Sequence, residues 1–182
     1  RRIDDGDAAA RGEAAEEHPG GLRPEPVGDL VGGVVAQPEQ VEVVDGRPVT
    51  ACLYGPVTDE FFMAVAGNGA TRNGVAIAAS GGASIAQARI AGPKGLLERL
   101  AGVAPPFAAM PRVPSLALRL ARVAQGTFDA AIAGGNSHDW DLAAADLLVH
   151  EAGGAITPFG GGPVIYNRPV PRHGTLVAAG RD

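Results

Sequence analysis

The sequence has 182 residues, 46% apolar and 19% charged, a balance typical of a globular domain large enough to bury a core. Its net charge of −5 argues against non-specific binding to a nucleic-acid polymer, which needs a basic face. The single cysteine excludes an intrachain disulfide and a cysteine-rich zinc site. Because neither an 18-residue apolar span nor a secretory leader is recognisable, we expect a cytoplasmic protein without a membrane partner.

Residues 1–40 differ in composition from the rest of the chain. Through Asp29 they carry eight acidic residues against four arginines, and Gly and Pro interrupt them. Their apolar residues follow neither helical nor strand periodicity. We therefore predict two parts: a divergent, weakly ordered acidic segment over residues 1–40 and a folded domain over residues 41–182.

The first third of the predicted domain has the pattern of antiparallel strands. Strand-like runs at 41–44 and 48–54 flank an Asp-Gly pair, which favours a two-residue hairpin turn. Residues 60–65 predict a third strand, and residues 71–75 predict a further short hairpin. Together these elements predict an antiparallel meander.

The rest of the domain alternates helices and strands. Leucines at helical spacing predict a helix over 94–101. A clearer helix is predicted over 115–126, where Ser115 suits the N-cap and Gly126 the C-terminal cap. The remaining predictions are a strand over 128–133, a helix over 141–151, and strands over 155–157 and 176–179. This order predicts a layered α/β or α+β fold.

The polar loop before helix 141–151 holds the candidate functional residues. A buried strand ends there in a Gly-rich loop, which delivers Asp139 and Asp141 to the start of a helix. Unpaired N–H groups and the helix dipole favour negative side chains at that position. A carboxylate there could bind magnesium, which prefers oxygen ligands. Ordinary helix capping is the alternative, and it is the more frequent use of such residues.

Two segments at fixed spacing carry a family resemblance. Residues 140–144 (Trp-Asp-Leu-Ala-Ala) and 151–154 (Glu-Ala-Gly-Gly) together resemble the carboxy-terminal signature of the inositol monophosphatase superfamily. Residues 45–49, 54–57 and 67–74 resemble its central hairpins in the same order. The resemblance implies an αβαβα sandwich, of which this chain covers the central antiparallel hairpins and the C-terminal α/β part.

The resemblance also implies a chemistry. Asp141 occupies the position of a metal ligand, and two or three Mg2+ ions would polarise a phosphate ester and generate the hydroxide nucleophile. Trp140 would pack behind the site. Asn136, Ser137 and His138 are candidates for contact with a small phosphorylated substrate. Members of this family often form homodimers.

The family also uses acidic ligands upstream, namely a Glu-Glu pair and an Asp-Pro-Ile/Leu-Asp-Gly-Thr/Ser loop. The nearest candidates in this chain are Glu13, Glu17 and Asp29. No Asp-x-x-Asp-Gly stands between Pro19 and Gln40. An inactive fragment or remnant that retains the fold is therefore the alternative from another functional class.

Within the superfamily, residues 134–141 and 166–169 look more like bacterial 3′(2′),5′-bisphosphate nucleotidases. This predicts hydrolysis of 3′-phosphoadenosine 5′-phosphate, with inositol-1-phosphate or a related sugar phosphate as the alternative. Arg119 and Arg122 are expected on the solvated face of helix 115–126 and not at a phosphate site.

Overall fold

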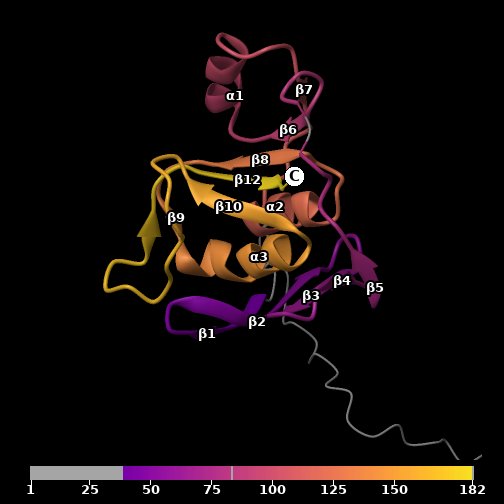
Figure 1. Cartoon of the computed structure of the whole chain (residues 1–182), viewed down its shortest axis with the longest axis vertical. Helices are drawn as coiled ribbons and strands as arrows, with labels where there is room; N and C mark the ends of the chain where they lie inside the picture. The colour runs from indigo at the N-terminus through magenta and orange to yellow at the C-terminus, as the bar shows by residue number, and fades with distance from the viewer. Residues whose placement is uncertain (1–38, 83, 182) are drawn as a thin grey trace, which may run out of the picture. The chain divides into compact units, whose positions relative to one another are not determined.

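The structure, a computed structural model, describes residues 39–82 and 84–181. The predicted acidic segment, apart from its last two residues, lies outside this part, as do the candidate ligands Glu13, Glu17 and Asp29. Within the described part, two five-stranded sheets lie on either side of a pair of helices (Figure 1). The predicted layered α/β architecture is therefore confirmed.

The first sheet is the predicted antiparallel meander, in the order β1-β2-β3-β4-β5. Its strands are β1 (Glu39–Val44), β2 (Arg47–Gly55), β3 (Glu60–Val65), β4 (Ala70–Arg72) and β5 (Val75–Ile77). Asp45 and Gly46 join β1 to β2 with φ angles of 49° and 73°. Asn73 and Gly74 join β4 to β5 in the same way, at 50° and 77°. A two-residue turn with both positions left-handed favours these residue types, which is why the sequence predicts both hairpins correctly.

One face of this sheet forms the core and the other is open among the described residues. Along β3, Phe62 and Ala64 are buried, whereas Phe61, Met63 and Val65 alternate with them and are exposed. The buried face packs against helix α3 (Asp139–Glu151). Alternation along β3 thus directs every second side chain towards the helices.

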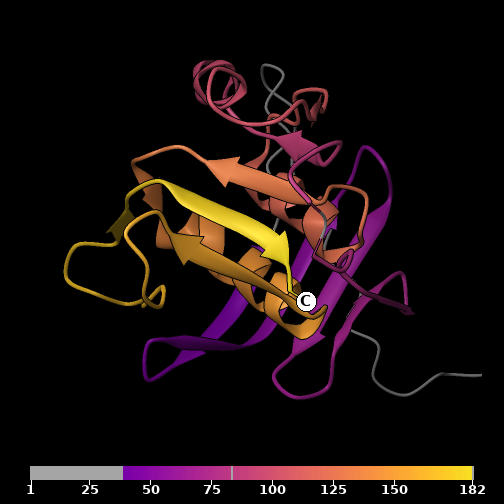
Figure 2. The same cartoon turned by 45° about the horizontal axis from the view of Figure 1, so that its top comes forward.

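The second sheet is mixed, in the order β10-β12-β8-β6-β7, and Figure 2 shows β12 between β8 and β10. Its strands are β6 (Arg89–Ala91), β7 (Ala108–Ala109), β8 (Ala130–Ala133), β10 (Gly154–Pro158) and β12 (Leu176–Gly180). Strand β8 pairs antiparallel with β12 and parallel with β6. The predicted strands correspond to β8, β10 and β12. Strands β6 and β7 are too short to leave a periodic pattern in the sequence.

Helix α1 (Lys94–Ala101) covers the β6 side of the second sheet, as predicted from its leucines. Leu96, Leu97 and Leu100 pack against Ile90 and Ile132 of that sheet. This makes a small apolar cluster separate from the main core. No helix in the described ranges is long and apolar enough to cross a membrane.

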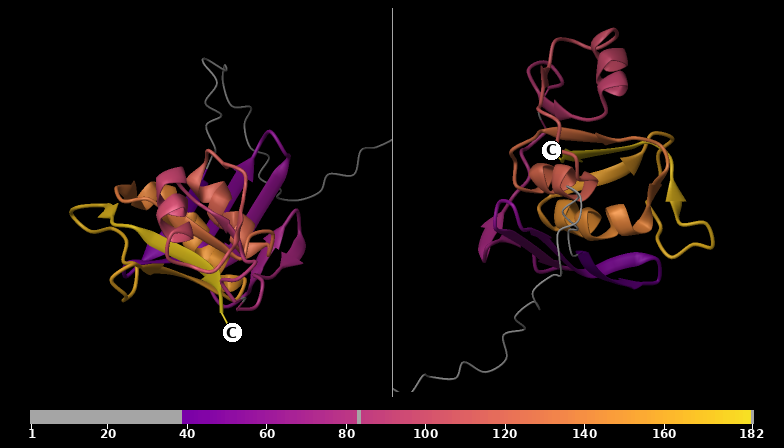
Figure 3. Two further views of the ribbon diagram at one scale, coloured as in Figure 1. Left: turned by 90° about the horizontal axis from the view of Figure 1, so that it is seen from above. Right: turned by 180° about the vertical axis from the view of Figure 1, so that it is seen from behind.

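Helices α2 (Leu116–Ala124) and α3 fill the space between the sheets (Figure 3, right). Ser115 caps α2 as predicted, since its hydroxyl accepts the N–H of Leu118 at 3.2 Å. Helix α3 begins at Asp139, two residues earlier than predicted. Its residues from Leu142 to Val149 are all buried, because one sheet covers each side.

The expectation that Arg119 and Arg122 lie on a solvated helix face is wrong. Arg122 forms an ion pair with the buried Glu60 of β3, with Nη1 2.6 Å from Oε1. Its guanidinium holds the pKa of the Glu60 carboxyl below its usual value. Arg119 donates to the main-chain oxygens of Val113 and Ile132 at 3.0 and 3.2 Å. Packing on both sides of α2 leaves these long side chains among protein groups.

A second ion pair attaches β6 to the segment before β8. The Asp129 carboxylate accepts from the Arg89 backbone N–H at 2.7 Å and from its guanidinium Nη2 at 2.7 Å. These bonds hold the pKa of Asp129 well below its usual range. This pairing positions a strand that has only three residues of its own.

We expect Asp129→Asn to lower the free energy of unfolding by about 1–3 kcal/mol at pH 7, since charge-assisted hydrogen bonds are lost. The folded-state pKa of Asp129 lies below its unfolded value of about 3.9, so its contribution is complete above that pH and declines as pH falls through the folded value. Urea denaturation at pH 7 and below pH 3 should show the two proteins converging at low pH. If the two proteins differed in free energy of unfolding by the same amount at both pH values, the ion pair would not be the source of that difference.

Candidate active site

The loop from β8 to α3 carries the candidate residues and is held by a small sheet of its own. Strand β9 (Ser137–His138) pairs antiparallel with β11 (Arg172–His173). Asn136 adopts a left-handed φ of 74°, and its backbone N–H donates to the His173 oxygen at 2.9 Å. The Asn136 side chain is exposed. Sequence patterns gave no sign of this pairing, because each strand has only two residues.

Asp139, the first residue of α3, is fully engaged within the protein. One carboxylate oxygen lies 2.6 Å from Nε2 of His173, and the other accepts the N–H of Asn167 at 2.8 Å. Its side chain is only 15% exposed. His173 thus pairs with Asp139. This carboxylate ties the start of α3 to the β11 segment, and each of its oxygens has a partner within the protein.

Asp141 has a different environment only two residues later. Its Oδ2 accepts the backbone N–H of His138 at 3.3 Å, which is a helix-capping contact. Its side chain is 43% exposed, and a carboxylate offers about four acceptor positions. Asp141 therefore caps its helix and still presents oxygen to solvent, so capping and metal binding are compatible at this residue.

Ser137 and His138, shortly before Asp141, are buried and half-buried respectively. Ser137 is buried, and its hydroxyl donates to the oxygen of Gly134 at 3.0 Å. His138 stacks on Trp140, with ring centroids 4.3 Å apart and planes 11° from parallel, and its Nδ1 lies 3.9 Å from Asp141 Oδ2. Substrate contacts by Asn136, Ser137 and His138 remain predictions.

The expected packing of Trp140 behind the site is wrong, because this residue is 62% exposed. Trp140 lies in the first turn of α3, before the buried stretch of the helix begins at Leu142. Its one ring contact in the described part of the chain is with His138. The indole therefore lies beside Asp141 on the surface.

The second half of the signature serves the fold. The Glu151 carboxylate accepts the backbone N–H groups of Gly67 and Gly69 at 3.0 and 2.9 Å, which ties the end of α3 to the β3–β4 turn. At Gly154, an added Cβ would lie 2.7 Å from the Ala179 oxygen, so that only glycine fits between helix and sheet. These contacts give the second half of the signature a structural role.

A buried polar pair, Asp146 and Tyr166, was not predicted. The Tyr166 hydroxyl donates to Asp146 Oδ2 at 2.9 Å. Burial raises the pKa of Asp146, and the Tyr166 bond partly opposes that rise. Tyr166 also donates its backbone N–H to the oxygen of Gly46 at 3.0 Å. Of residues 166–169, which suggested a nucleotidase, Tyr166 is therefore part of the interior, whereas the other three residues are exposed.

The described residues satisfy part of what a magnesium site needs. Within residues 39–82 and 84–181, no group of three or more His, Cys, Asp or Glu side chains is placed to hold a metal ion. Magnesium is commonly held by one or two carboxylates together with waters and substrate phosphate. Asp141 fits one such ligand position, whereas Asp139 does not. The predicted upstream ligands lie outside the described residues.

Comparison with known proteins shows the family of this chain. The sequence model of the inositol monophosphatase family matches residues 41–181, and the chain belongs to that family. An inositol monophosphatase of Dictyostelium discoideum is 35% identical, over 63% of this chain and 46% of that protein. The Nus factor SuhB of Pseudomonas aeruginosa is 35% identical, over 64% of this chain and 46% of that protein.

A solved structure supports the fold in the same way. The extragenic suppressor protein SuhB of Bartonella henselae aligns with a TM-score of 0.64 at 29% identity, over 79% of this chain and 58% of that one. The predicted inositol monophosphatase-like fold is therefore confirmed. The chain spans about half the length of the curated relatives that it matches.

Removal of the charge should destabilise the protein more at Asp139 than at Asp141. We expect Asp139→Asn to lower the free energy of unfolding by about 1–3 kcal/mol, because two hydrogen bonds to a charged acceptor are weakened. Asp141→Asn should cost about 0.5 kcal/mol or less, since Asn caps helices as well as Asp does. Urea denaturation with equal m-values would measure both. Equal losses would show that Asp141 is also a structural residue.

Proposed function

We propose that this chain forms the carboxy-terminal part of a magnesium-dependent phosphomonoesterase that hydrolyses a small phosphate ester. The observation that carries the proposal is the environment of Asp141. It is a half-exposed carboxylate at a helix start, within the segment that resembles the family signature. The nearby Asp139 is bonded to His173 and Asn167 through its two oxygens, whereas Asp141 keeps part of its carboxylate available to a metal ion.

The residues around Asp141 suit an anionic substrate beside a cation. The first turn of α3 presents backbone N–H groups and the positive end of a helix dipole, which favours a phosphate group. His138, half-buried and stacked on Trp140, is held in a fixed orientation beside the carboxylate. The exposed Asn136 amide can donate to a substrate oxygen. Magnesium bound by Asp141 would supply the charge that polarises the ester and activates water.

The substrate is a choice between two phosphate esters. The name of the Dictyostelium relative, an inositol monophosphatase, supports an inositol monophosphate. The resemblance of residues 134–141 supports 3′-phosphoadenosine 5′-phosphate. Residues 166–169 add less to the second choice, because Tyr166 serves the interior. We therefore place inositol-1-phosphate first and the nucleotide second.

Metal binding can be tested without catalysis. A ligand that binds the folded state stabilises it by about 2.7 kcal/mol at a hundred times its Kd. We expect magnesium to raise the Tm of the wild-type chain, and we expect Asp141→Asn to remove most of this rise. Glu42→Gln, which alters an exposed carboxylate on β1, is the control and should behave as wild type. An unchanged magnesium response in Asp141→Asn would overturn its assignment as a ligand.

Hydrolysis is tested by phosphate release from inositol-1-phosphate and from 3′-phosphoadenosine 5′-phosphate, with and without magnesium. We expect magnesium-dependent release from one of them, with a loss of at least about tenfold in Asp141→Asn, because a metal ligand costs more than its supporting contacts do. The preferred ester identifies the substrate class. No release from a folded sample would favour the alternative, a remnant that keeps the fold without activity.

A further inference from the structure

The first turn of α3 is the part of that helix that the core does not fix. Burial along the helix begins at Leu142, whereas Trp140 is 62% exposed and the side chain of Asp141 is 43% exposed. The direction in which Asp141 presents its carboxylate is therefore not set by packing between the sheets. It depends on contacts that hold the N-terminal end of the helix.

The orientation of Asp141 depends first on β9. Its Oδ2 accepts the backbone N–H of His138 at 3.3 Å, which is long for a hydrogen bond. Because His138 belongs to β9, the position of this N–H follows the position of that strand. A pair of two-residue strands such as β9 and β11 has little stability of its own. Further bonds are needed to fix β9 and, with it, the carboxylate of Asp141.

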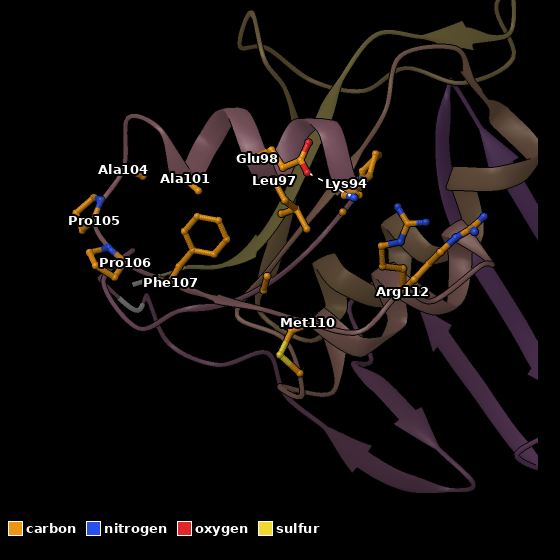
Figure 4. A pocket seen from close by; sticks show the side chains of 14 residues that line it. Lys94, Leu97, Glu98, Ala101, Ala104, Pro105, Pro106, Phe107, Met110 and Arg112 are labelled. Carbon is orange, nitrogen blue, oxygen red and sulfur yellow. Dashed lines mark ion pairs between the residues drawn. The ribbon is translucent and has the colours of Figure 1, made fainter.

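The loop before α3 has different surroundings at its two ends. At its start, Gly134 lies next to Pro93, since an added Cβ would be 3.6 Å from the Pro93 ring. Pro93 and Lys94 line a cavity beside α1 (Figure 4). At its end, the loop runs into β9 and its partner β11. An open cavity cannot hold a loop in place, so the attachment to β11 has that task.

Backbone bonds extend the pairing of β9 with β11 at both ends. Before β9, the Asn136 N–H donates to the His173 oxygen at 2.9 Å. After β9, the Asp139 N–H donates to the Pro171 oxygen at 3.2 Å. Residues 136–139 are thus attached to β11 up to the first residue of α3.

The His173 side chain continues this attachment into the helix. Its Nε2 lies 2.6 Å from Asp139 Oδ1, and the two side chains are 12% and 15% exposed. An ionised carboxylate only accepts, so Nε2 carries the proton and donates it to Asp139. A bond to a charged acceptor, largely removed from water, is stronger than a bond between neutral backbone groups. His173 therefore adds a strong link to the start of α3.

His173 is itself held from its other side. Its ring contacts that of the buried Tyr166, with centroids 5.5 Å apart and planes 54° from parallel. The Tyr166 hydroxyl donates to Asp146, which follows Asp139 by about two helical turns and lies on the same face of α3. The segment of residues 166–173 thus binds α3 at two points along one face, and His173 lies between them.

We propose that His173 is a positioning residue: through Asp139 it holds the first turn of α3 in the arrangement in which Asp141 presents an oxygen to solvent. The proposed function places magnesium at that oxygen, and the inference rests on it for the role of the metal. The arrangement itself rests on the contacts of His173, Asp139 and His138.

Fluorescence tests the arrangement without metal. Trp140 is the only tryptophan of the sequence and stacks on His138, so its signal reports on the first turn of α3 and on β9. In EDTA, we expect His173→Phe, which keeps a ring beside Tyr166 but has no donor, to increase acrylamide quenching and to lower the anisotropy. His173→Gln, whose amide can donate from the place of Nε2, should restore both. Equal quenching and anisotropy in the three proteins would refute the proposal.

Magnesium binding tests what the positioning does for Asp141. The rise in free energy of unfolding on adding magnesium depends on the Kd of the metal, whatever the stability of the metal-free protein. We expect His173→Phe to bind magnesium about tenfold more weakly, as loss of a supporting contact does, and His173→Gln to bind it as wild type does. A full magnesium response in His173→Phe would make His173 a structural residue only.

Asp129→Asn is the control for lost stability, because its ion pair with Arg89 lies at β6 and not at α3. It should be less stable than wild type and keep the whole magnesium response. If it lost as much of the response as His173→Phe, the effect would come from general destabilisation and the proposal would fall.

A double variant tests the route through Asp139. If His173 acts through that carboxylate, adding His173→Phe to Asp139→Ala should weaken magnesium binding no further, whereas additive losses would exclude this route. Circular dichroism checks that each variant folds. Should His173→Phe fail to fold, His173→Asn replaces it, because its shorter amide does not reach Asp139.

Failure of the proposed function is seen separately. If magnesium stabilises neither the wild type nor any variant, the metal site is wrong. The positioning of Asp141 by His173 then stands or falls on the quenching and anisotropy measured in EDTA.

Discussion

The structure depends on one constraint, which is that α3 lies between two sheets. A helix covered on both sides has no solvated face along most of its length, so its central residues must be apolar and small enough for close approach. The run from Leu142 to Val149 meets this need, with three consecutive alanines and one buried carboxylate, Asp146, that is bonded to Tyr166. Because both sheets rest on this helix, its position sets the geometry of everything attached to its ends.

The two ends of α3 consequently have different roles. At its C-terminal end, Glu151 binds the N–H groups of the β3–β4 turn and Gly154 admits a neighbouring strand at close range. At its N-terminal end, Asp139 ties the start of the helix to the β11 segment through His173 and Asn167. The fold uses most of the polar residues near the helix. Asp141 stands out because its capping contact leaves part of its carboxylate in solvent.

The environments of the two arginines of α2 follow from the same layered packing. Helix α2 sends Arg122 towards the first sheet, where it meets Glu60, and sends Arg119 towards the end of β8, where it meets main-chain oxygens. Arg122 therefore has a carboxylate partner, whereas Arg119 is bonded to main-chain oxygens. Arg119 and Arg122 are three residues apart on one helix, yet one donates to main-chain oxygens and the other forms an ion pair.

The sequence alone determined the elements whose signals are local. Asp-Gly and Asn-Gly turns, strand alternation in β3, the Ser115 cap and the small-residue helix 141–151 each act through neighbouring residues, so each was predicted. The family resemblance likewise named Asp141. Only the tertiary structure decided what depends on distant partners: the pairing of His173 with Asp139, the burial of Arg122 against Glu60, the exposure of Trp140 and the two-residue strands β9 and β11. Hydrogen bonds and ion pairs between residues tens of positions apart leave no periodic trace in a sequence, because their geometry exists only once the layers have packed.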